Sequence, residues 1–303
     1  MKDKKTFINK TVYLIICASF GIIGPLVKAI SLPSPAKACY RAWFASAALL
    51  IFLLVSGKIK DKMDFKKEIV PMLISGSFIG ICWIGLFEGY AYTTVAKSTL
   101  FYNLSPMIVF ILTPLILKEK FTLKHILCAL ACAAGMILVS GALEEGTAAA
   151  GEFKGIAYAS CGAVFYAGVV LMNKRFPNGG PVNRTFWQLF AAALIVTPYI
   201  LIRYDASELK PTAKDILLLL VLGILLTAVT YILYFNTMVK IPARTVSIFT
   251  YADPVVACFV SIFWMHEKMS LISVAGAAVI IAASVLSEID FGKKNREGNR
   301  IDE

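Results

Sequence analysis

The stretch FYNLSPMIVFILTPLILKEK at residues 101–120 has a counterpart in FTYADPVVACFVSIFWMHEK at residues 249–268. A shift of 148 positions places Pro106 on Pro254 and Glu119 on Glu267 without a gap. Each stretch is an apolar segment interrupted by a proline, which cannot donate a helical hydrogen bond. A Glu-Lys pair follows at the same distance in both. This joint spacing predicts that one helical unit occurs twice in the chain.

The segments upstream of these stretches also match, at a shift of 146 positions. Lys28 falls on Lys174, and Pro35 falls on Pro181. Chance alignment of Leu- and Ala-rich helices is the alternative explanation, because strict identity is sparse. The agreement of the Pro and Glu-Lys spacings favours a duplicated unit of five helices.

The composition is that of a membrane protein. The mean hydropathy is +0.75 and 58% of the 303 residues are hydrophobic, which is more apolar than a soluble domain. Ten windows of about 20 apolar residues are each long enough to cross a hydrocarbon core of about 30 Å. We predict an all-α integral membrane fold whose ten helices lie near 11–30, 36–56, 69–90, 95–117, 122–142, 154–174, 184–202, 214–238, 242–265 and 270–288.

Five helices is an odd number, so the second copy is expected to be inverted relative to the first. The predicted organisation is a cytoplasmic tail at 1–10, a first repeat at 11–142, an external connecting loop at 143–153, a second repeat at 154–288 and a cytoplasmic tail at 289–303. Inverted repeats around a site near the midplane are typical of secondary transporters.

The positive charges are distributed asymmetrically between the two sides. With the N-terminus cytoplasmic, 21 of the 30 Lys and Arg residues lie in the cytoplasmic segments, as the positive-inside rule requires. We therefore expect a multi-pass protein of the cell membrane with both termini in the cytoplasm. The net charge of +11 is attributed to this topology, and no nucleic-acid partner is predicted.

No pattern of metal-binding or catalytic residues stands out. The seven cysteines and two histidines do not form clusters at ligand spacing, and we interpret the cysteines as buried free thiols. Neither a metal nor another cofactor is predicted, and the chain is not expected to be an enzyme. The oligomeric state is unknown from the sequence.

Small residues mark the expected helix contacts. Gly76, Gly80, Gly85 and Gly89 follow one another along the third predicted helix, at spacings that permit close helix packing. Gly135 in the fifth predicted helix and Gly276 in the tenth are expected to pack either the two halves or two protomers.

At this point the chain resembles the drug/metabolite transporter superfamily, specifically its EamA-type ten-helix members. The resemblance covers about 11–288 and is carried by Tyr40-Arg41, Leu104-Ser105-Pro106 and Asp253-Pro254 with the two repeated glutamates. Family members often have Glu where Asp253 stands, and Trp is commoner than Phe20 before Gly21. The resemblance implies a carrier that moves small metabolites or drug-like solutes, often outward, driven by protons or by the solute gradient.

We single out four of the ionisable residues within the predicted spans, Arg41, Glu88, Lys97 and Asp253, because charges there are costly and often functional. Arg41 is predicted either to bind a substrate carboxylate or phosphate or to be a structural partner of Glu88 or of helix-end carbonyls. Lys97 either reaches the membrane interface or is a cavity cation that attracts an anionic group or pairs with Glu88. Glu88 either takes part in coupling or is simply hydrated.

Asp253 lies near the middle of the ninth predicted helix, so its carboxylate cannot reach the interface. It is predicted to be a proton-coupling group, the alternative being a protonated acid that only fixes the helix break. Pro106 and Pro254 leave the carbonyls of Tyr102 and Thr250 without a helical donor. We predict helix breaks at both prolines beside a central cavity.

Aromatic and amide side chains are expected to line this cavity. The predicted substrate-binding residues are Arg41, Lys97, Tyr102, Asn103, Tyr166, Trp187 and Tyr251. The predicted function is secondary-active transport of a small amphipathic, amino-acid-like solute, as an exporter that works by alternating access and is coupled to protons. A passive channel or facilitator and an integral membrane enzyme are the alternatives.

Overall fold

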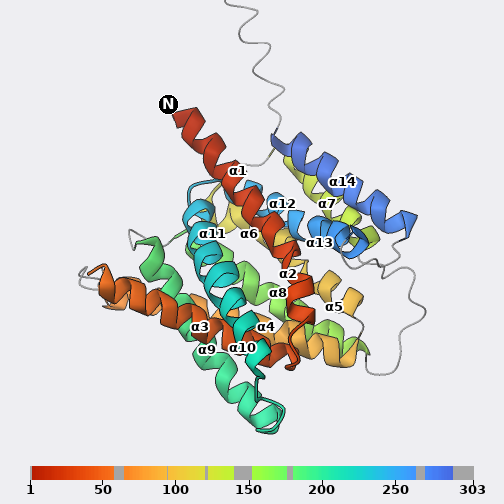
Figure 1. The fold of residues 1–303 in the computed structure, drawn as a ribbon. Coiled ribbons are helices and arrows are strands. Elements are labelled where there is room, and N and C mark those ends of the chain that lie inside the picture. Colours follow the sequence, from red (N-terminus) through yellow and green to blue (C-terminus); the bar gives the residue numbers. More distant parts are fainter. Residues whose placement is uncertain are drawn as a thin grey trace, which may run out of the picture.

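The computed structural model describes residues 2–57, 65–93, 95–119, 122–139, 152–175, 180–263 and 270–288. These residues form helices joined by short connections, with no strand among them (Figure 1). Six helical stretches are long and apolar enough to cross a membrane, and two shorter apolar helices accompany them. The chain is therefore an all-helical, multi-pass membrane protein.

The N-terminal half contains α1 (Lys2–Gly21), α2 (Ile23–Lys28), α3 (Ser34–Val55), the π-helical turn η2 (Phe65–Ile69) and α4 (Val70–Tyr92). It continues with α5 (Val95–Tyr102), α6 (Ser105–Leu117) and α7 (Leu123–Val139). The first predicted span is broken between α1 and α2. The reason is that Pro25 has no N–H to donate to the carbonyl of Gly21, where α1 ends.

The C-terminal half contains α8 (Glu152–Asn173), α9 (Pro181–Arg203), α10 (Ala213–Leu220), the π-helical segment η3 (Val221–Val229) and α11 (Thr230–Met238). It ends with α12 (Ala243–Thr250), α13 (Ala252–Phe263) and α14 (Leu271–Glu288). α10, η3 and α11 form one continuous stretch. Its start is fixed by a capping box in which Thr212 and Asp215 each bond the other's backbone N–H.

Prolines begin several of these helices. Pro35 lies in the first turn of α3, Pro71 in that of α4, Pro106 in that of α6 and Pro181 in that of α9. The first residues of a helix have no intrahelical acceptor for their N–H groups, so proline costs nothing there.

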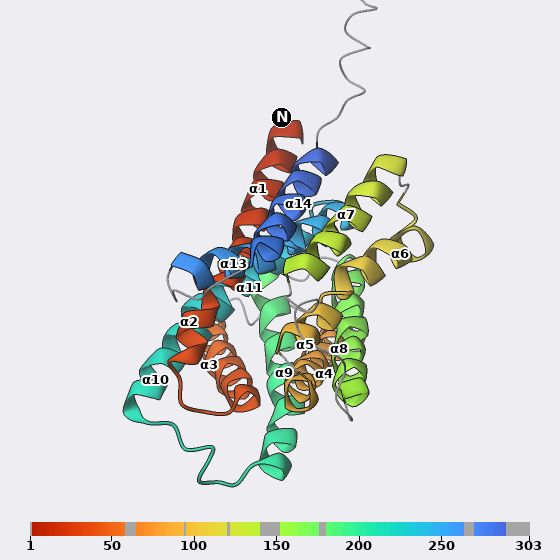
Figure 2. The same cartoon turned by 90° about the vertical axis from the view of Figure 1, so that its right-hand side faces the viewer.

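The glycines of α4 let this helix contact two neighbours closely. A Cβ atom at Gly76 would lie 2.2 Å from the carbonyl oxygen of Gln188 in α9, and one at Gly85 would lie 2.7 Å from the carbonyl oxygen of Tyr158 in α8. α4 therefore lies against both α8 and α9 (Figure 2). The predicted packing role of this glycine series is confirmed.

α7 and α14 lie side by side at one edge of the bundle, away from α3, α4 and α9 (Figures 1 and 2). Gly135 and Gly276 permit this contact, since a Cβ atom at Gly135 would lie 2.9 Å from the carbonyl oxygen of Gly276. These glycines thus join the two halves of one chain, one of the two arrangements expected from the sequence.

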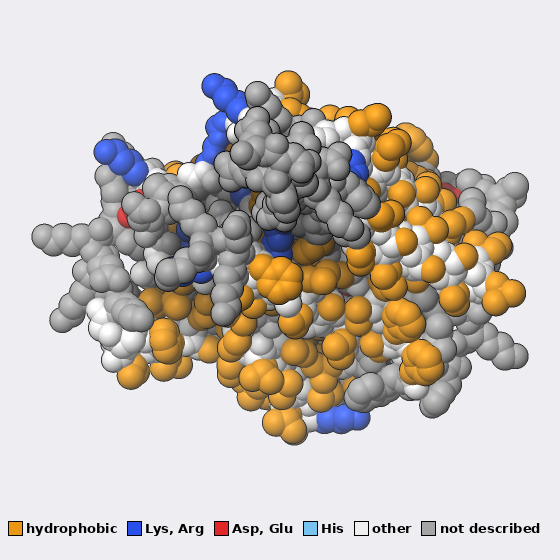
Figure 3. Space-filling view, turned by 90° about the horizontal axis from the view of Figure 1, so that it is seen from above, with side chains coloured by type: hydrophobic (Ala, Val, Ile, Leu, Met, Phe, Trp, Pro, Cys, Tyr) orange, Lys and Arg blue, Asp and Glu red, His pale blue; other side chains and the backbone are white. Residues whose placement is uncertain are grey.

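Apolar side chains dominate the outer surface as well as the core. Phe153, Ile202 and Leu271 are more than four-fifths exposed, and Figure 3 shows hydrophobic side chains over most of the described part of one face. Such a surface fits lipid better than water. Cys161 is also exposed, contrary to the expectation of buried thiols, because it lies on an outward face of α8. The side chain of Cys258 lies outside the described part.

Candidate functional site

A cavity of about 610 Å³ lies inside the bundle, and both halves of the chain line it. It is bordered by α1, α2, α3, α4, α5 and α6 from the first half and by α8, η3, α11, α12 and α13 from the second. Its walls are mostly apolar and aromatic, with a few polar groups. The polar and aromatic lining residues are Cys17, Phe20, Ser34, Lys37, Arg41, Trp83, Phe87, Tyr90, Tyr102, Asn103, Ser105, Tyr166, Tyr231, Tyr234, Thr250 and Asp253.

Arg41 enters this cavity from α3. Its guanidinium carbon lies 4.4 Å from the centroid of the Trp83 ring, which is a cation–π arrangement. Its Nε atom is buried and has no hydrogen-bond partner among the described residues. An unsatisfied buried donor costs about 1–3 kcal/mol, so an anionic group or water in the cavity would be stabilised here.

Asp253 lines the cavity from the second position of α13. α12 ends at Thr250 and α13 begins at Ala252, so the helix is interrupted just before this carboxylate. The free N–H groups at the start of α13 favour a negative charge at this position. The lining therefore contains one acid in addition to its basic groups.

The corresponding interruption in the first half lies between α5, which ends at Tyr102, and α6, which begins at Ser105. Pro106 and Pro254 occupy the second and third positions of the helices that follow the two interruptions. Asn103 and Tyr251 lie in the two short turns, and the Tyr251 hydroxyl donates to the Asn103 carbonyl at 3.4 Å.

A chain of hydroxyl groups borders the cavity. The Tyr166 and Tyr234 oxygens are 2.5 Å apart, Tyr13 donates to Tyr234 at 3.2 Å, and the Tyr13 and Thr250 oxygens are 3.3 Å apart. These residues come from α8, α11, α1 and α12, so the chain ties four helices together. Tyr13 and Tyr234 are almost fully buried, and their hydrogen bonds satisfy groups that would otherwise be costly to bury.

Tyr102 and Asn103 lie together with Tyr166 at the cavity. The ring centroids of Tyr102 and Tyr166 are 5.9 Å apart, and the Tyr102 hydroxyl lies 3.7 Å from the sulfur of Cys82. The Asn103 amide donates to the carbonyl of Thr99 at 2.9 Å. The structure thus brings Arg41, Tyr102, Asn103, Tyr166 and Asp253 around one cavity.

Two of the predicted substrate-binding residues, Trp187 and Tyr251, lie outside this lining. Trp187 packs against Phe186, with ring centroids 5.0 Å apart, on α9. The Tyr251 side chain is buried, and its hydroxyl bonds to the Asn103 carbonyl in the turn between α5 and α6. Lys97 belongs to α5, but its side chain lies outside the described part.

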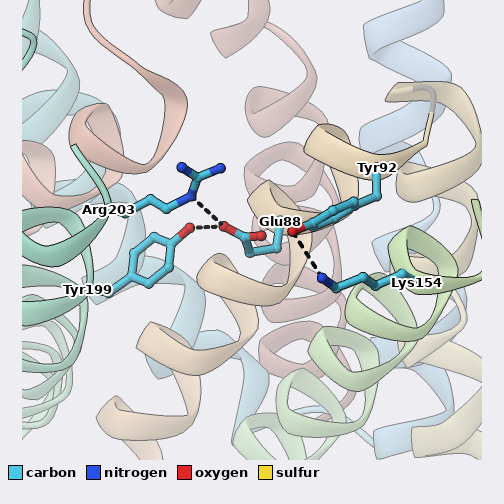
Figure 4. A network of polar contacts seen from close by, with 5 residues as sticks. All are labelled: Glu88, Tyr92, Lys154, Tyr199 and Arg203. Carbon is cyan, nitrogen blue, oxygen red and sulfur yellow. Dashed lines mark hydrogen bonds and ion pairs between the residues drawn. The ribbon is translucent and has the colours of Figure 1, made fainter. Parts of the chain in front are cut away.

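Glu88, a predicted coupling residue, is also absent from the lining and belongs to a separate network between α4 and α9 (Figure 4). Its carboxylate accepts a hydrogen bond from the Tyr199 hydroxyl and lies 3.8 Å from the Nε atom of Arg203. Lys154 donates to the nearby Tyr92 hydroxyl at 3.1 Å. Glu88 thus connects the end of α4 to the end of α9. Among the interactions of the described residues, Glu88 and Arg41 do not pair.

Lys37 was not expected at the cavity, and Tyr13 was not expected in the hydroxyl chain beside it. Lys37 lies in the first turn of α3 and donates from Nζ to the carbonyl of Val27 at 2.8 Å. A shift of 146 positions places Tyr13 on Ala159, so the proposed repeat gives no signal for Tyr13. Among the described residues, no group of three or more His, Cys, Asp or Glu side chains could hold a metal ion.

Membrane-capable helices around an internal cavity define a multi-pass membrane protein, and comparison with known proteins identifies its family. The model of the EamA-like transporter family matches residues 10–141 and 153–288, and this chain belongs to that family. Its relatives include the uncharacterized transporter YxxF of Bacillus subtilis (strain 168), which is 26% identical over 100% of this chain and 96% of its own length.

Two further comparisons agree. Protein PecM of Dickeya dadantii (strain 3937) is 23% identical and covers 69% of each chain. A solved crystal structure superposes with a TM-score of 0.78 at 17% identity, over 93% of this chain and 96% of that one. At that identity the superposition shows a shared fold. The chain is a membrane transporter by family, and this makes an enzymatic role the less favoured class.

Proposed function

We propose that this protein is a secondary-active exporter of a small amphipathic, amino-acid-like solute, which it moves by alternating access. The observation that carries this proposal is the cavity itself, where Arg41 and Asp253 lie among aromatic rings. A cation and a carboxylate in one apolar enclosure complement a solute that has both charges and an apolar body.

The proposed ten-helix inverted repeat is supported by the packing of the helices. Shifting the sequence by 146 to 148 positions exchanges α3 with α9 and α7 with α14, and each of these pairs is in contact. The shift also converts the contact between α4 and α9 into that between η3 and α3, which is observed. The family model matches two stretches of similar length. Equivalent halves of this kind can exchange inward- and outward-open states.

The two proline breaks fit the same proposal. Asn103 and Tyr251 are equivalent under the 148-residue shift, and they bond each other between the two interrupted helices. Broken helices that meet at a cavity are the usual site of substrate binding in transporters built from repeats. In the proposed mechanism Asp253 carries a proton during the cycle, and its counterpart Ser105 does not.

The proposed orientation places both termini in the cytoplasm of a cell whose plasma membrane holds the protein. It follows from the charge asymmetry of the sequence. Glu88 is less suited to coupling than Asp253, because it lies outside the cavity lining and is held by Tyr199 and Arg203. A passive channel is the second candidate, since an aromatic cavity also suits facilitated diffusion.

The first experiment is a thermal-stability screen of the purified protein against amino acids, nucleotide sugars, phosphorylated sugars and amphipathic amines. A solute that binds only the folded state raises the melting temperature. We expect a shift with amino acids that is lost in Arg41→Gln and Asp253→Asn and kept in Trp187→Phe. A shift with another solute class, or one unaffected by both cavity variants, would contradict the assignment.

Transport in proteoliposomes then separates a carrier from a channel. A carrier shows saturable flux that is accelerated by solute on the opposite side, whereas a channel shows neither property. With a carrier, Asp253→Asn is expected to abolish uptake driven by a proton gradient while leaving solute exchange measurable. Loss of both activities with normal solute binding would argue against proton coupling at Asp253.

A further inference from the structure

Three charged side chains connect the ends of α6, α8, α11 and α12 on the side predicted to face the cytoplasm. Both carboxylate oxygens of Glu119 accept from the backbone N–H of Ala243, at 3.0 and 3.1 Å. Lys174 donates from Nζ to the carbonyls of Met238 and Ile241. Arg175 donates to the carbonyl of Ile116, near the end of α6.

These contacts close a ring. Glu119 links the segment that follows α6 to the start of α12. Lys174 links the end of α8 to the connection between α11 and α12, and Arg175 links α8 back to α6. The helices themselves are in contact where the ring requires it, since α6 contacts both α8 and α12, and α8 also contacts α11 (Figure 1).

The ring stabilises the connection between α11 and α12, whose backbone groups at the two helix ends need hydrogen-bond partners from other segments. Pro242 has no N–H group, and it precedes the first residue of α12 without a side-chain cap. Met238 is the last residue of α11, and Ile241 lies in the connection that follows it. The first N–H groups and last carbonyls of helices need partners from elsewhere, and here charged side chains of α8 and the α6–α7 connection supply them.

The ring is separated from the cavity by one stretch of α12. Ala243 and Thr250 are seven residues apart, or about 10 Å along a helix. Ser247 lies between them and is buried, and its hydroxyl donates to the carbonyl of Ala243 at 3.0 Å. Ser247 and Thr250 share a helix face, so this face leads from the ring to the hydroxyl chain at the cavity.

We propose that Glu119 and Lys174 form a latch that keeps the cytoplasmic end of the transport path closed, and that its release admits solute from that side. This inference rests on the proposed alternating-access function. Lys174 and Glu119 bind the connection at its Met238 and Ala243 ends. The hydrogen bonds of both side chains must therefore break before α12 can move away from α6 and α8.

The test measures access to the path without requiring transport. In a variant whose seven native cysteines are replaced by serine or alanine, Ser247→Cys serves as the reporter. It is labelled in inside-out membrane vesicles with a thiol reagent that does not cross membranes. Glu119→Ala and Lys174→Met are expected to accelerate labelling about tenfold or more, because losing one charge-assisted hydrogen bond shifts an opening equilibrium by roughly that factor.

Three controls keep this result specific. Lys240→Met removes an exposed cation from the same connection without touching the latch, and its labelling rate should equal that of the parent. A second reporter, Ser46→Cys, lies at a buried position of α3. It should stay unreactive in the latch variants, and this result would exclude general unfolding as the cause of faster labelling. Lys174→Arg should retain slow labelling because it keeps the charge and the donors.

Unchanged labelling in both latch variants, or equal acceleration by Lys240→Met, would overturn the latch. Reactive Ser46→Cys in the latch variants would overturn it too, since the pair would then hold the whole fold. Failure of the proposed function is a separate outcome. It would appear as the absence of solute binding and transport in the unaltered protein, whatever the labelling rates are.

Discussion

Gly76→Ala should force α4 and α9 apart, and the structure sets the size of the effect. The added Cβ atom would lie 2.2 Å from the carbonyl oxygen of Gln188 and 2.8 Å from the Cβ atom of Ala191. Ordinary contact between such atoms needs 3.4 Å or more. Since the obstacle is backbone, the helices must separate locally by about 1 Å, and neighbouring dispersion contacts weaken with them.

Overpacking of this kind costs about 1–3 kcal/mol. Alanine regains up to about 1 kcal/mol of helix propensity over glycine, so we expect the free energy of unfolding to fall by about 1–2 kcal/mol. Gly168→Ala is the intermediate case. Its Cβ atom would meet only the Phe78 ring, at 2.8 Å, and a side chain can turn away, so we expect a change within about 1 kcal/mol.

Gly180→Ala is the matched control, because nothing lies within 4 Å of its added Cβ atom and its change should stay within about 0.5 kcal/mol. The free energy of unfolding is measured for all three variants by titrating sodium dodecyl sulfate into detergent micelles and following the far-ultraviolet circular dichroism. The expected order of destabilisation is Gly76, then Gly168, then Gly180. A Gly76→Ala protein as stable as Gly180→Ala would refute the close contact between α4 and α9.

Three further outcomes follow from particular contacts. Tyr234→Phe should lower the free energy of unfolding by about 1 kcal/mol, because the Tyr166 hydroxyl loses its bonded neighbour; the same titration checks this. Arg203→Met should change it by less than about 0.5 kcal/mol, because an ion pair with a 54% exposed partner at 3.8 Å is weak, whereas Glu88→Ala removes a buried acceptor and should cost more. Burial lowers the pKa of Lys174 to about 8, against the opposing effect of a nearby carboxylate. The unfolded chain therefore binds more protons than the folded one between about pH 8 and 10.5, so the stability of the unaltered protein relative to Lys174→Met should rise with pH across that window, as melting temperatures over a pH series would show.

The sequence predicted the membrane class, the family and the contact role of the glycines, because these depend on local composition and spacing. A helix that must cross lipid is apolar over a defined length, and that signal needs no knowledge of the partner helices. Gly76 and Gly85 were predictable as contact points for the same reason, since only their spacing along one helix was required. Which helices they meet was not predictable from the spacing.

Membership of the cavity depended on tertiary structure. Trp187 and Tyr166 are both aromatic residues in apolar helices, and their local sequences do not differ in any way that assigns one to the cavity. Tyr166 reaches it because α8 packs against α5 and α6, whereas Trp187 contacts the rings of its own helix. Rotation of a helix about its axis decides this, and it is set by the sum of all its contacts.

The sequence by itself therefore determined the membrane class and the family, the positions of the prolines and the charges that the chain holds. Only the tertiary structure decided which of those charges meet. Glu88 joined Tyr199 and Arg203 and did not pair with Arg41, and Glu119 reached Ala243, 124 residues further along the chain. The physical reason is that residue spacing fixes the face of a helix, while the packing of several helices at once fixes what that face touches.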